Sequence, residues 1–294
     1  MPKANVNNIT IEYETIGDPI SKPLLMITGL GSQLLAWSDE ICNVLAENGF
    51  FVIRFDNRDV GLSTKFEDAG IPDMVEISAA YTRGEIPKVP YTLEDMADDA
   101  IGVLDALNIE KAHICGASMG GMIAQIIAYR HPARVLSLAL IMSTTGNPEL
   151  PHSKPDIMMQ FFAPVPSERE AYIDEMVKRD SLITGTFPYD ERQSREYRTR
   201  EYDRCYYPEG IARQLAAMAV PGNIKPYISA ILAPTIVIHG SEDPFNLIEA
   251  GKDIATTIPN AELLIIDGMG HSFSREVLPE IIEALIANSN KNNA

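Results

Sequence analysis

Short apolar runs alternate with helical patterns along most of this chain, and no other feature constrains the fold as much. Helical patterns such as those of residues 93–109 and 122–130 lie between several of the runs. Strands that alternate with helices form a mostly parallel sheet, because a crossover helix carries the chain back to the start of the next strand. We therefore predict an α/β fold. The apolar runs that read as buried parallel strands occupy residues 23–29, 51–56, 111–116, 137–142, 234–240 and 261–267.

Two stretches depart from this alternation. Residues 5–17 alternate polar with β-branched and aromatic side chains around Asn7-Asn8, which predicts an antiparallel hairpin at the edge of the sheet. Between residues 146 and 230 there are proline-rich connectors, a capping box at Ser167 and Glu170 and several helical segments, but no convincing strand. We predict an α/β core domain of residues 1–145 and 231–294, with residues 146–230 as a helical cap, or lid.

Composition narrows the classes of partner. The 294 residues are 46% hydrophobic and carry a formal net charge of −17, which argues against nucleic acid, since its recognition needs a basic surface. Three cysteines lie far apart and fit a reducing compartment. Neither a signal peptide nor a run of about 18 apolar residues is visible, so we expect a soluble cytoplasmic protein that does not insert in membranes. The oligomeric state stays open, with a homodimer as one possibility.

The stretch HICGASMGGM, residues 113–122, places Ser118 between glycines after a strand pattern and before a helix pattern. This is G-x-S-x-G in the setting of a nucleophile elbow, where a sharp turn exposes the serine Oγ and small neighbours let strand and helix approach each other. A strand-to-helix connection that needs small residues only for close packing would show the same sequence pattern. The nucleophile reading therefore demands a base and a carboxylate elsewhere in the chain, because a serine hydroxyl is a poor nucleophile at neutral pH.

One of the five histidines suits the role of base. His271 lies on a glycine-rich loop after the last strand pattern and before the last helix pattern, where catalytic groups concentrate. The others lie within or at the end of a strand pattern, before a helix-ending proline or in a proline-rich connector, and we expect them to be structural or exposed. They are His113, His239, His131 and His152.

The orienting acid and the oxyanion donors follow other strands. The stretch HGSEDP offers Glu242 and Asp243 as the acid, whereas the loop after residues 137–142 offers none. An oxyanion hole needs two backbone N–H groups. We expect one from Met119, the residue after the serine, and one from Leu30, which stands between two glycines in TGLGSQ.

With these residues in place, the chain resembles the α/β-hydrolase superfamily over nearly its whole length. The resemblance implies that Ser118 is the nucleophile, His271 the base and Asp243, rather than Glu242, the orienting acid. It gives Leu30 and Met119 the role of oxyanion donors. Within the superfamily, RFDNRDVGLST is similar to the esterase branch that includes the aclacinomycin methylesterases. The segments that carry the match are TGLGSQ, FDNRDVGLS, CGASMGG, HGSEDP and GMGHSF.

Two segments differ from the family pattern or allow a second interpretation. Many relatives have His-Gly where this chain has Thr28-Gly29, which affects the fine structure of the oxyanion loop but not the backbone donor. Asp56, Arg58 and Asp59 could suggest a binding site, but we interpret FDNRDVGLS as a segment that organises the turn after a strand.

The predicted activity is hydrolysis of neutral, small to medium esters through an acyl-enzyme, with a small-molecule ester as substrate and neither metal nor organic cofactor. A cofactor-free perhydrolase, a carbon-carbon bond hydrolase and a proline iminopeptidase would use the same triad. A ligand receptor with vestigial hydrolysis is the alternative from another class. In the cap, the stretch IMMQFF supplies one apolar cluster that could line a pocket: Met158, Met159, Phe161 and Phe162. Met158, Phe161 and Phe162 are the candidate substrate-binding residues, although packing of the helix on the core is the more common reason for such a cluster.

Overall fold

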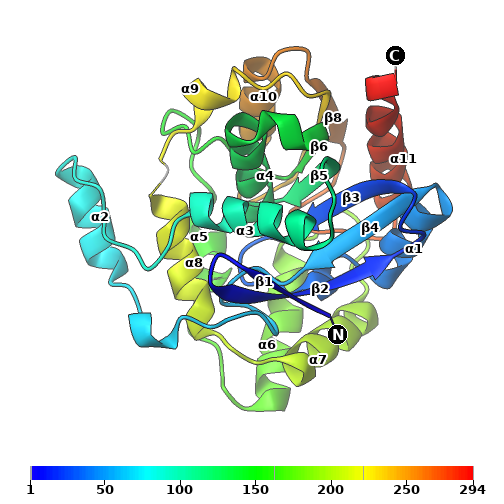
Figure 1. Ribbon diagram of the computed structural model, residues 1–294. Helices are drawn as coiled ribbons and strands as arrows, with labels where there is room; N and C mark the ends of the chain where they lie inside the picture. Colours follow the sequence, from blue (N-terminus) through cyan, green and yellow to red (C-terminus); the bar gives the residue numbers. More distant parts are fainter. Residues whose placement is uncertain (1, 162, 221, 294) are drawn as a thin grey trace.

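The computed structural model describes residues 2–161, 163–220 and 222–293, and within them eight strands form one sheet at the centre of the molecule (Figure 1). The strand order across the sheet is β1-β2-β4-β3-β5-β6-β7-β8. The strands are β1 Lys3–Val6, β2 Ile9–Ile16, β3 Lys22–Ile27, β4 Phe50–Phe55, β5 Ala112–Ala117, β6 Val135–Ile141, β7 Thr235–Gly240 and β8 Glu262–Ile266.

The sheet is parallel except at its N-terminal edge. β1 pairs with β2 through a tight turn at Asn7 and Asn8, which have φ values of +47° and +64°, and β2 pairs antiparallel with β4. Asparagine tolerates this left-handed backbone better than most residues, and two positive φ values in a row match the twist of a hairpin. The predicted fold class and the edge hairpin are both confirmed.

Helices cover both faces of the sheet, and each face has its own apolar core (Figure 1). Successive side chains of β3 alternate between them: Leu25 and Ile27 pack in one core, Leu24 and Met26 in the other. The helices on the first face are α3 Leu93–Ala106, α4 Met119–Arg130 and α10 Ile248–Thr257, and those on the second are α1 Asp39–Glu47 and α11 Leu278–Ser289.

The chain between β6 and β7 is helical. Its described residues contain no strand, only an isolated bridge between Gly185 and Met269. The helices are α5 Pro155–Phe161, α6 Arg169–Leu182, α7 Glu191–Arg204, α8 Glu209–Ala219 and α9 Lys225–Ile228. The predicted capping box of α6 is wrong by one residue. Glu168, not Ser167, is the N-cap, because its carboxylate accepts hydrogen bonds from the amides of both Glu170 and Ala171.

One further helix, α2 Met74–Thr82, extends from the body of the molecule between β4 and α3, and it lies at the left edge of Figure 1. No helix in the described residues is long and apolar enough to cross a membrane. Short 3-10 helices occupy Leu34–Ala36, Glu67–Ala69, Pro132–Arg134 and Asn290–Asn293.

The segment after β4 joins this helical region to the sheet. The carboxylate of Asp56 pairs with Arg204 of α7 at 2.7 Å, and that of Asp59 pairs with Arg213 of α8 at 2.8 Å. The side chain of Asp56 also accepts from the amide of Leu62 at 2.8 Å within its own turn. The structural interpretation of FDNRDVGLS is confirmed, and its acids hold α7 and α8 as well as the turn.

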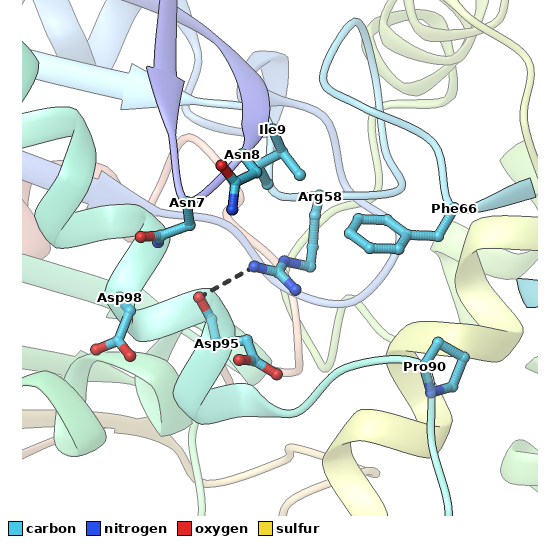
Figure 2. A pocket seen from close by; sticks show the side chains of 8 residues that line it. All are labelled: Asn7, Asn8, Ile9, Arg58, Phe66, Pro90, Asp95 and Asp98. Atoms are coloured by element: carbon cyan, nitrogen blue, oxygen red, sulfur yellow. Dashed lines mark hydrogen bonds between the residues drawn. The ribbon is translucent and has the colours of Figure 1, made fainter.

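Arg58 points the other way, toward α3. Figure 2 shows its guanidinium reaching the carbonyl oxygen of Asp95, and it also pairs with Asp99 at 2.7 Å. This arginine lines an open depression of about 530 Å³, whose wall includes Asn7 and Phe66 but no residue of the predicted triad.

Candidate active site

Ser118 lies between the end of β5 and the start of α4, with φ +55° and ψ −120°. Residues other than glycine rarely adopt this backbone conformation, so the surrounding packing must enforce it. Glycines make that packing feasible: a Cβ on Gly116 would lie 2.1 Å from the carbonyl oxygen of Gly120, and one on Gly121 would lie 2.5 Å from Cβ of Ser143. The sharp strand-to-helix turn predicted at Ser118 is therefore present, with its serine in a strained conformation.

The structure brings the other two predicted residues to this serine. His271 Nε2 lies 3.0 Å from Ser118 Oγ, and His271 Nδ1 lies 2.7 Å from Asp243 Oδ2. Asp243 follows β7 and His271 follows β8, so the three groups meet at the carboxyl ends of parallel strands. Because an ionised carboxylate only accepts hydrogen bonds, Nδ1 carries the proton of the neutral imidazole, and Nε2 is left to accept from the serine hydroxyl.

Asp243 is fixed by its own loop. Its side chain has no solvent exposure, and its Oδ1 accepts from the amides of Phe245 and Asn246 at 2.8 and 3.0 Å, which leaves Oδ2 for the histidine. The neighbouring Glu242 is exposed. His239 is buried beneath this loop and donates from Nε2 to the carbonyl oxygen of Asn246, while burial lowers its pKa and keeps it neutral.

The two predicted oxyanion donors flank the serine. A Cβ on Gly29 would lie 3.2 Å from Cβ of Ser118, so the loop that carries Leu30 passes directly beside the nucleophile. Met119 is the first residue of α4, and its amide therefore has no acceptor within the helix. Among the hydrogen bonds between described residues, none uses the amide of Leu30 or Met119 as a donor.

Thr28 makes hydrogen bonds that close the oxyanion loop. Thr28 Oγ1 donates to the carbonyl oxygen of Ser32 at 3.0 Å, and Asn57 Nδ2 donates to the carbonyl oxygen of Thr28 at 3.3 Å. The loop therefore closes on itself through the hydroxyl group. A histidine is not needed to hold its first residue in place.

Phe161 of the predicted cluster is linked to the triad through one aromatic ring, whereas Met159 is exposed. The ring centroid of Phe161 lies 4.7 Å from that of Phe245, whose ring is 5.1 Å from the imidazole of His271. Met158 is half-buried on the same helix. Phe162 lies outside the described residues.

Sequence reasoning missed two groups that hold the catalytic loops from the helical region. The amide of His271 donates to the carbonyl oxygen of Ile183 at 2.7 Å, and the amide of Gly31 donates to Gln214 Oε1 at 2.8 Å. Backbone carbonyls carry no sequence signal, and a lone glutamine on an amphipathic helix looks like any polar surface residue.

The cysteine thiols are not activated as nucleophiles. Burial raises the pKa of the Cys42 thiol to about 11 and raises that of Cys115 still further, so both thiols stay protonated. Cys205 is half-buried, and burial raises its pKa as well. No cluster of three or more histidine, cysteine or acidic side chains in the described part of the chain could hold a metal ion.

Residues 22–275 match the family described as alpha/beta hydrolase fold. The chain belongs to this family. It is 27% identical to rhodomycin D methylesterase DauP of Streptomyces sp. strain C5 over 96% of both chains. It is 28% identical to a 2-hydroxy-6-oxononadienedioate/2-hydroxy-6-oxononatrienedioate hydrolase of Cupriavidus pinatubonensis over 85% of this chain and 81% of that one.

Solved structures agree on the fold of this α/β hydrolase. The enol-lactonase of Burkholderia xenovorans superposes with a TM-score of 0.73 at 23% identity, covering 99% of this chain and all of the other. The likeness in fold therefore extends over nearly the whole chain, including the helical region between β6 and β7.

Proposed function

We propose that this α/β hydrolase is a serine carboxylic-ester hydrolase that works through an acyl-enzyme. The observation that carries the proposal is the continuous chain Ser118 Oγ, His271 Nε2, His271 Nδ1 and Asp243 Oδ2, with contacts of 3.0 and 2.7 Å, on a strained elbow. The methylesterase name of a relative matched over 96% of both chains supports an ester as substrate.

The first half-reaction forms the acyl-enzyme. His271 Nε2 takes the proton from Ser118 Oγ as Oγ bonds to the ester carbonyl carbon, and the carbonyl oxygen becomes an oxyanion. The amides of Leu30 and Met119 stabilise that charge; removing one such donor costs about 3 kcal/mol in other hydrolases. The tetrahedral intermediate then breaks its bond to the alkoxy oxygen, which leaves as the alcohol with the proton from His271.

The second half-reaction repeats these roles with water. His271 takes a proton from water as the water oxygen attacks the acyl carbon, and the bond to Ser118 Oγ breaks as the serine regains a proton from the imidazolium. Asp243, buried and fixed by two amides, keeps the imidazole in one tautomer throughout and stabilises its cationic form. The product acid departs and the enzyme is restored.

The charge around the helical region supports neutral esters as the substrate class. Its buried arginines face carboxylates of the protein itself: Arg213 pairs with Asp59 and Arg179 pairs with Glu175, both at 2.8 Å. Arginines neutralised in this way are poorly suited to bind a substrate carboxylate, because their donors are already occupied. We propose neutral acyl groups of small to medium size.

We also propose that residues 146–230 act as a cap over the triad, on a core of residues 1–145 and 231–294. Supporting contacts come from three places: α5 through Phe161, the segment after α6 through Ile183, and α8 through Gln214. The last residues of the segment behave differently, since Ile224 and Ile228 pack in the apolar core on the first face of the sheet. They anchor the cap rather than cover the site. A cytoplasmic location and a homodimer stay predictions.

An ester panel tests the proposed function. Purified protein is assayed with methyl, ethyl and bulkier esters of short and aromatic acids, beside a vinylogous diketone, an N-terminal prolyl peptide and a peroxide-dependent halogenation assay. We expect esters to be turned over faster than all the other substrates, and we expect this turnover to vanish in Ser118→Ala. Preference for the diketone, the peptide or peroxide would replace the proposal with one of the enzyme alternatives, and tight ligand binding without turnover would favour a receptor.

A further inference from the structure

The oxyanion donor Leu30 lies in a β-turn whose conformation the sequence of the turn leaves open. The amide of Ser32 donates to the carbonyl oxygen of Gly29 at 3.3 Å, which closes a turn with Leu30 and Gly31 at its centre, and Gly31 has φ +67°. Glycine accepts either sign of φ at little cost, so the central peptide of such a turn can rotate. Rotation of this peptide would change the conformation of Leu30, whose amide is the proposed oxyanion donor.

A side chain from α8 accepts a hydrogen bond from this central peptide. Gln214 Oε1 accepts from the amide of Gly31 at 2.8 Å, while its Nε2 donates to the carbonyl oxygen of Arg58 at 2.9 Å. Gln214 is fully buried, so water cannot replace it as the acceptor without a change in packing. Its amide group therefore bridges the oxyanion loop and the segment after β4, and both of its polar atoms are used.

The position of Gln214 is itself determined by its neighbours. Arg213, the preceding residue, pairs with Asp59, and a Cβ on Gly210 would lie 2.0 Å from the carbonyl oxygen of Asp59. On the other side, a Cβ on Gly31 would lie 2.9 Å from the side chain of Ile211. Helix α8 is thus seated on the core by contacts that leave little freedom in the direction of the glutamine side chain.

We propose that Gln214 is a positioning residue for the oxyanion hole, acting from the cap through the amide of Gly31. Asn57 holds the loop on one side of the Leu30 amide through Thr28, and Gln214 holds it on the other. The Leu30 donor is then aimed at the oxyanion before the substrate arrives, which is the condition under which such a donor stabilises a transition state. The inference rests on the proposed ester hydrolysis at Ser118.

Three variants separate positioning from mere support of the fold. Gln214→Met keeps the length of the side chain but offers Gly31 no comparable acceptor. Gln214→Glu keeps an acceptor for Gly31 and loses the donor to Arg58. Lys225→Gln is the control, because it removes another cap-to-core ion pair, that between α9 and Asp253 of α10, without touching α8 or the oxyanion loop.

The readouts are kcat and KM for a good ester from the panel, and inhibition by an alkyl boronic acid. The boronic acid forms a tetrahedral adduct with a serine Oγ and places an oxygen in the oxyanion hole. We expect Gln214→Met to lower kcat by roughly 10- to 100-fold with KM changed by less than about threefold, and to weaken boronic acid inhibition by a similar factor. Gln214→Glu should recover much of both, and Lys225→Gln should alter neither by more than about threefold.

Wild-type kcat and inhibition in folded Gln214→Met would overturn the inference, and so would an equal loss in Lys225→Gln. Should Gln214→Met fail to fold, Gln214→Asn, one methylene shorter, is judged by the same two readouts. Failure of the proposed function would look different: the wild-type protein would hydrolyse no ester, or Ser118→Ala would keep its activity.

Discussion

The backbone amide of His271 donates a hydrogen bond to the carbonyl oxygen of Ile183, 2.7 Å away, in the segment that follows α6. Two further bonds run alongside it: the amide of Gly270 donates to Thr184, and that of Thr186 donates to Gly268. The loop that bears the proposed base therefore pairs, backbone to backbone, with the proposed cap. A shift of this cap segment would move the imidazole relative to the serine.

Substitution of Gly185 tests that coupling. A Cβ on this residue would lie 2.2 Å from the carbonyl oxygen of Gly268 and 2.6 Å from the amide nitrogen of Gly270, so Gly185→Ala must push the histidine loop away. Because a misplacement of about 1 Å can cost about 100-fold in rate, we expect kcat to fall by roughly 10- to 100-fold. Steady-state kinetics on the purified variant measures this.

Gly49→Ala is the matched control for the strain of the backbone. Gly49 has φ +83° and Gly185 has φ +84°, but a Cβ on Gly49 would meet nothing within 4 Å. Both variants should lose about 1 kcal/mol of stability from the left-handed backbone. Only Gly185→Ala should lose catalysis, and equal kcat in the two variants would show that the segment after α6 does not position the base.

Removal of either reacting group of the triad should abolish most ester turnover. We expect Ser118→Ala and His271→Ala each to lower kcat by roughly 10⁴- to 10⁶-fold, because members of a triad act as a unit. Circular dichroism and thermal melting should show an intact fold. Substantial turnover in a folded Ser118→Ala protein would reject the nucleophile, and a double variant no slower than either single one would support the shared role.

The two adjacent acids after β7 should behave very differently. Asp243→Asn keeps the shape of the side chain but can donate a hydrogen bond to His271 Nδ1, which favours the wrong tautomer, so we expect kcat to fall about 10⁴-fold. Glu242 is exposed, and Glu242→Gln should stay within about twofold of wild type. The opposite ranking of the two variants in the same assay would assign the orienting role to Glu242.

The aromatic contact chain from α5 to the base predicts a role in specificity. Phe161 packs on Phe245, which packs on His271, so Phe161→Ala should open space beside the triad without touching a reacting atom. We expect the ratio of kcat/KM between small and bulky esters to change roughly 10-fold, the usual effect of altered apolar pocket contacts. Met159 on the same helix is 74% exposed, and Met159→Ala should leave that ratio unchanged.

The fold and the positions of the triad residues followed from the sequence because each depends on local pattern. Buried parallel strands are short apolar runs, and the ends of such strands are where loops converge, so a serine after β5, an acid after β7 and a histidine after β8 had to meet. The choice between Glu242 and Asp243 came from family resemblance, and burial of Asp243 now gives it a physical reason.

The contacts that hold the loops of the site in place could not be predicted in the same way. Gln214 reaches Gly31 across 183 residues, and the carbonyl of Ile183 acts regardless of its side chain. Such contacts depend on where α6 and α8 settle on the core, and no local pattern in their sequences determines that. The predicted N-cap of α6 was wrong for a local reason. Ser167 fits the capping-box pattern, but the carboxylate of Glu168 accepts hydrogen bonds from two amides.

A buried histidine outside the site predicts how stability depends on pH. Burial, helped by the charge of Lys22, lowers the pKa of His113 from 6.5 to about 4 in the folded protein. Between these values the unfolded chain binds a proton that the folded protein does not, so stability falls as pH decreases from 6.5 toward 4. The full difference corresponds to about 3 kcal/mol.

His113→Gln removes this titration while it keeps a polar group near Ser137, whose Oγ lies 2.8 Å from His113 Nδ1. Urea unfolding at pH 7.0, 6.0, 5.0 and 4.5 should therefore give a shallower loss of stability for His113→Gln than for wild type. His152 is exposed, and His152→Gln should follow the wild-type curve. Carboxylates also titrate in this pH range and affect both proteins alike. The test is therefore the difference between the wild-type and His113→Gln curves. Parallel curves for wild type and His113→Gln would mean that His113 takes up its proton equally well in the folded protein.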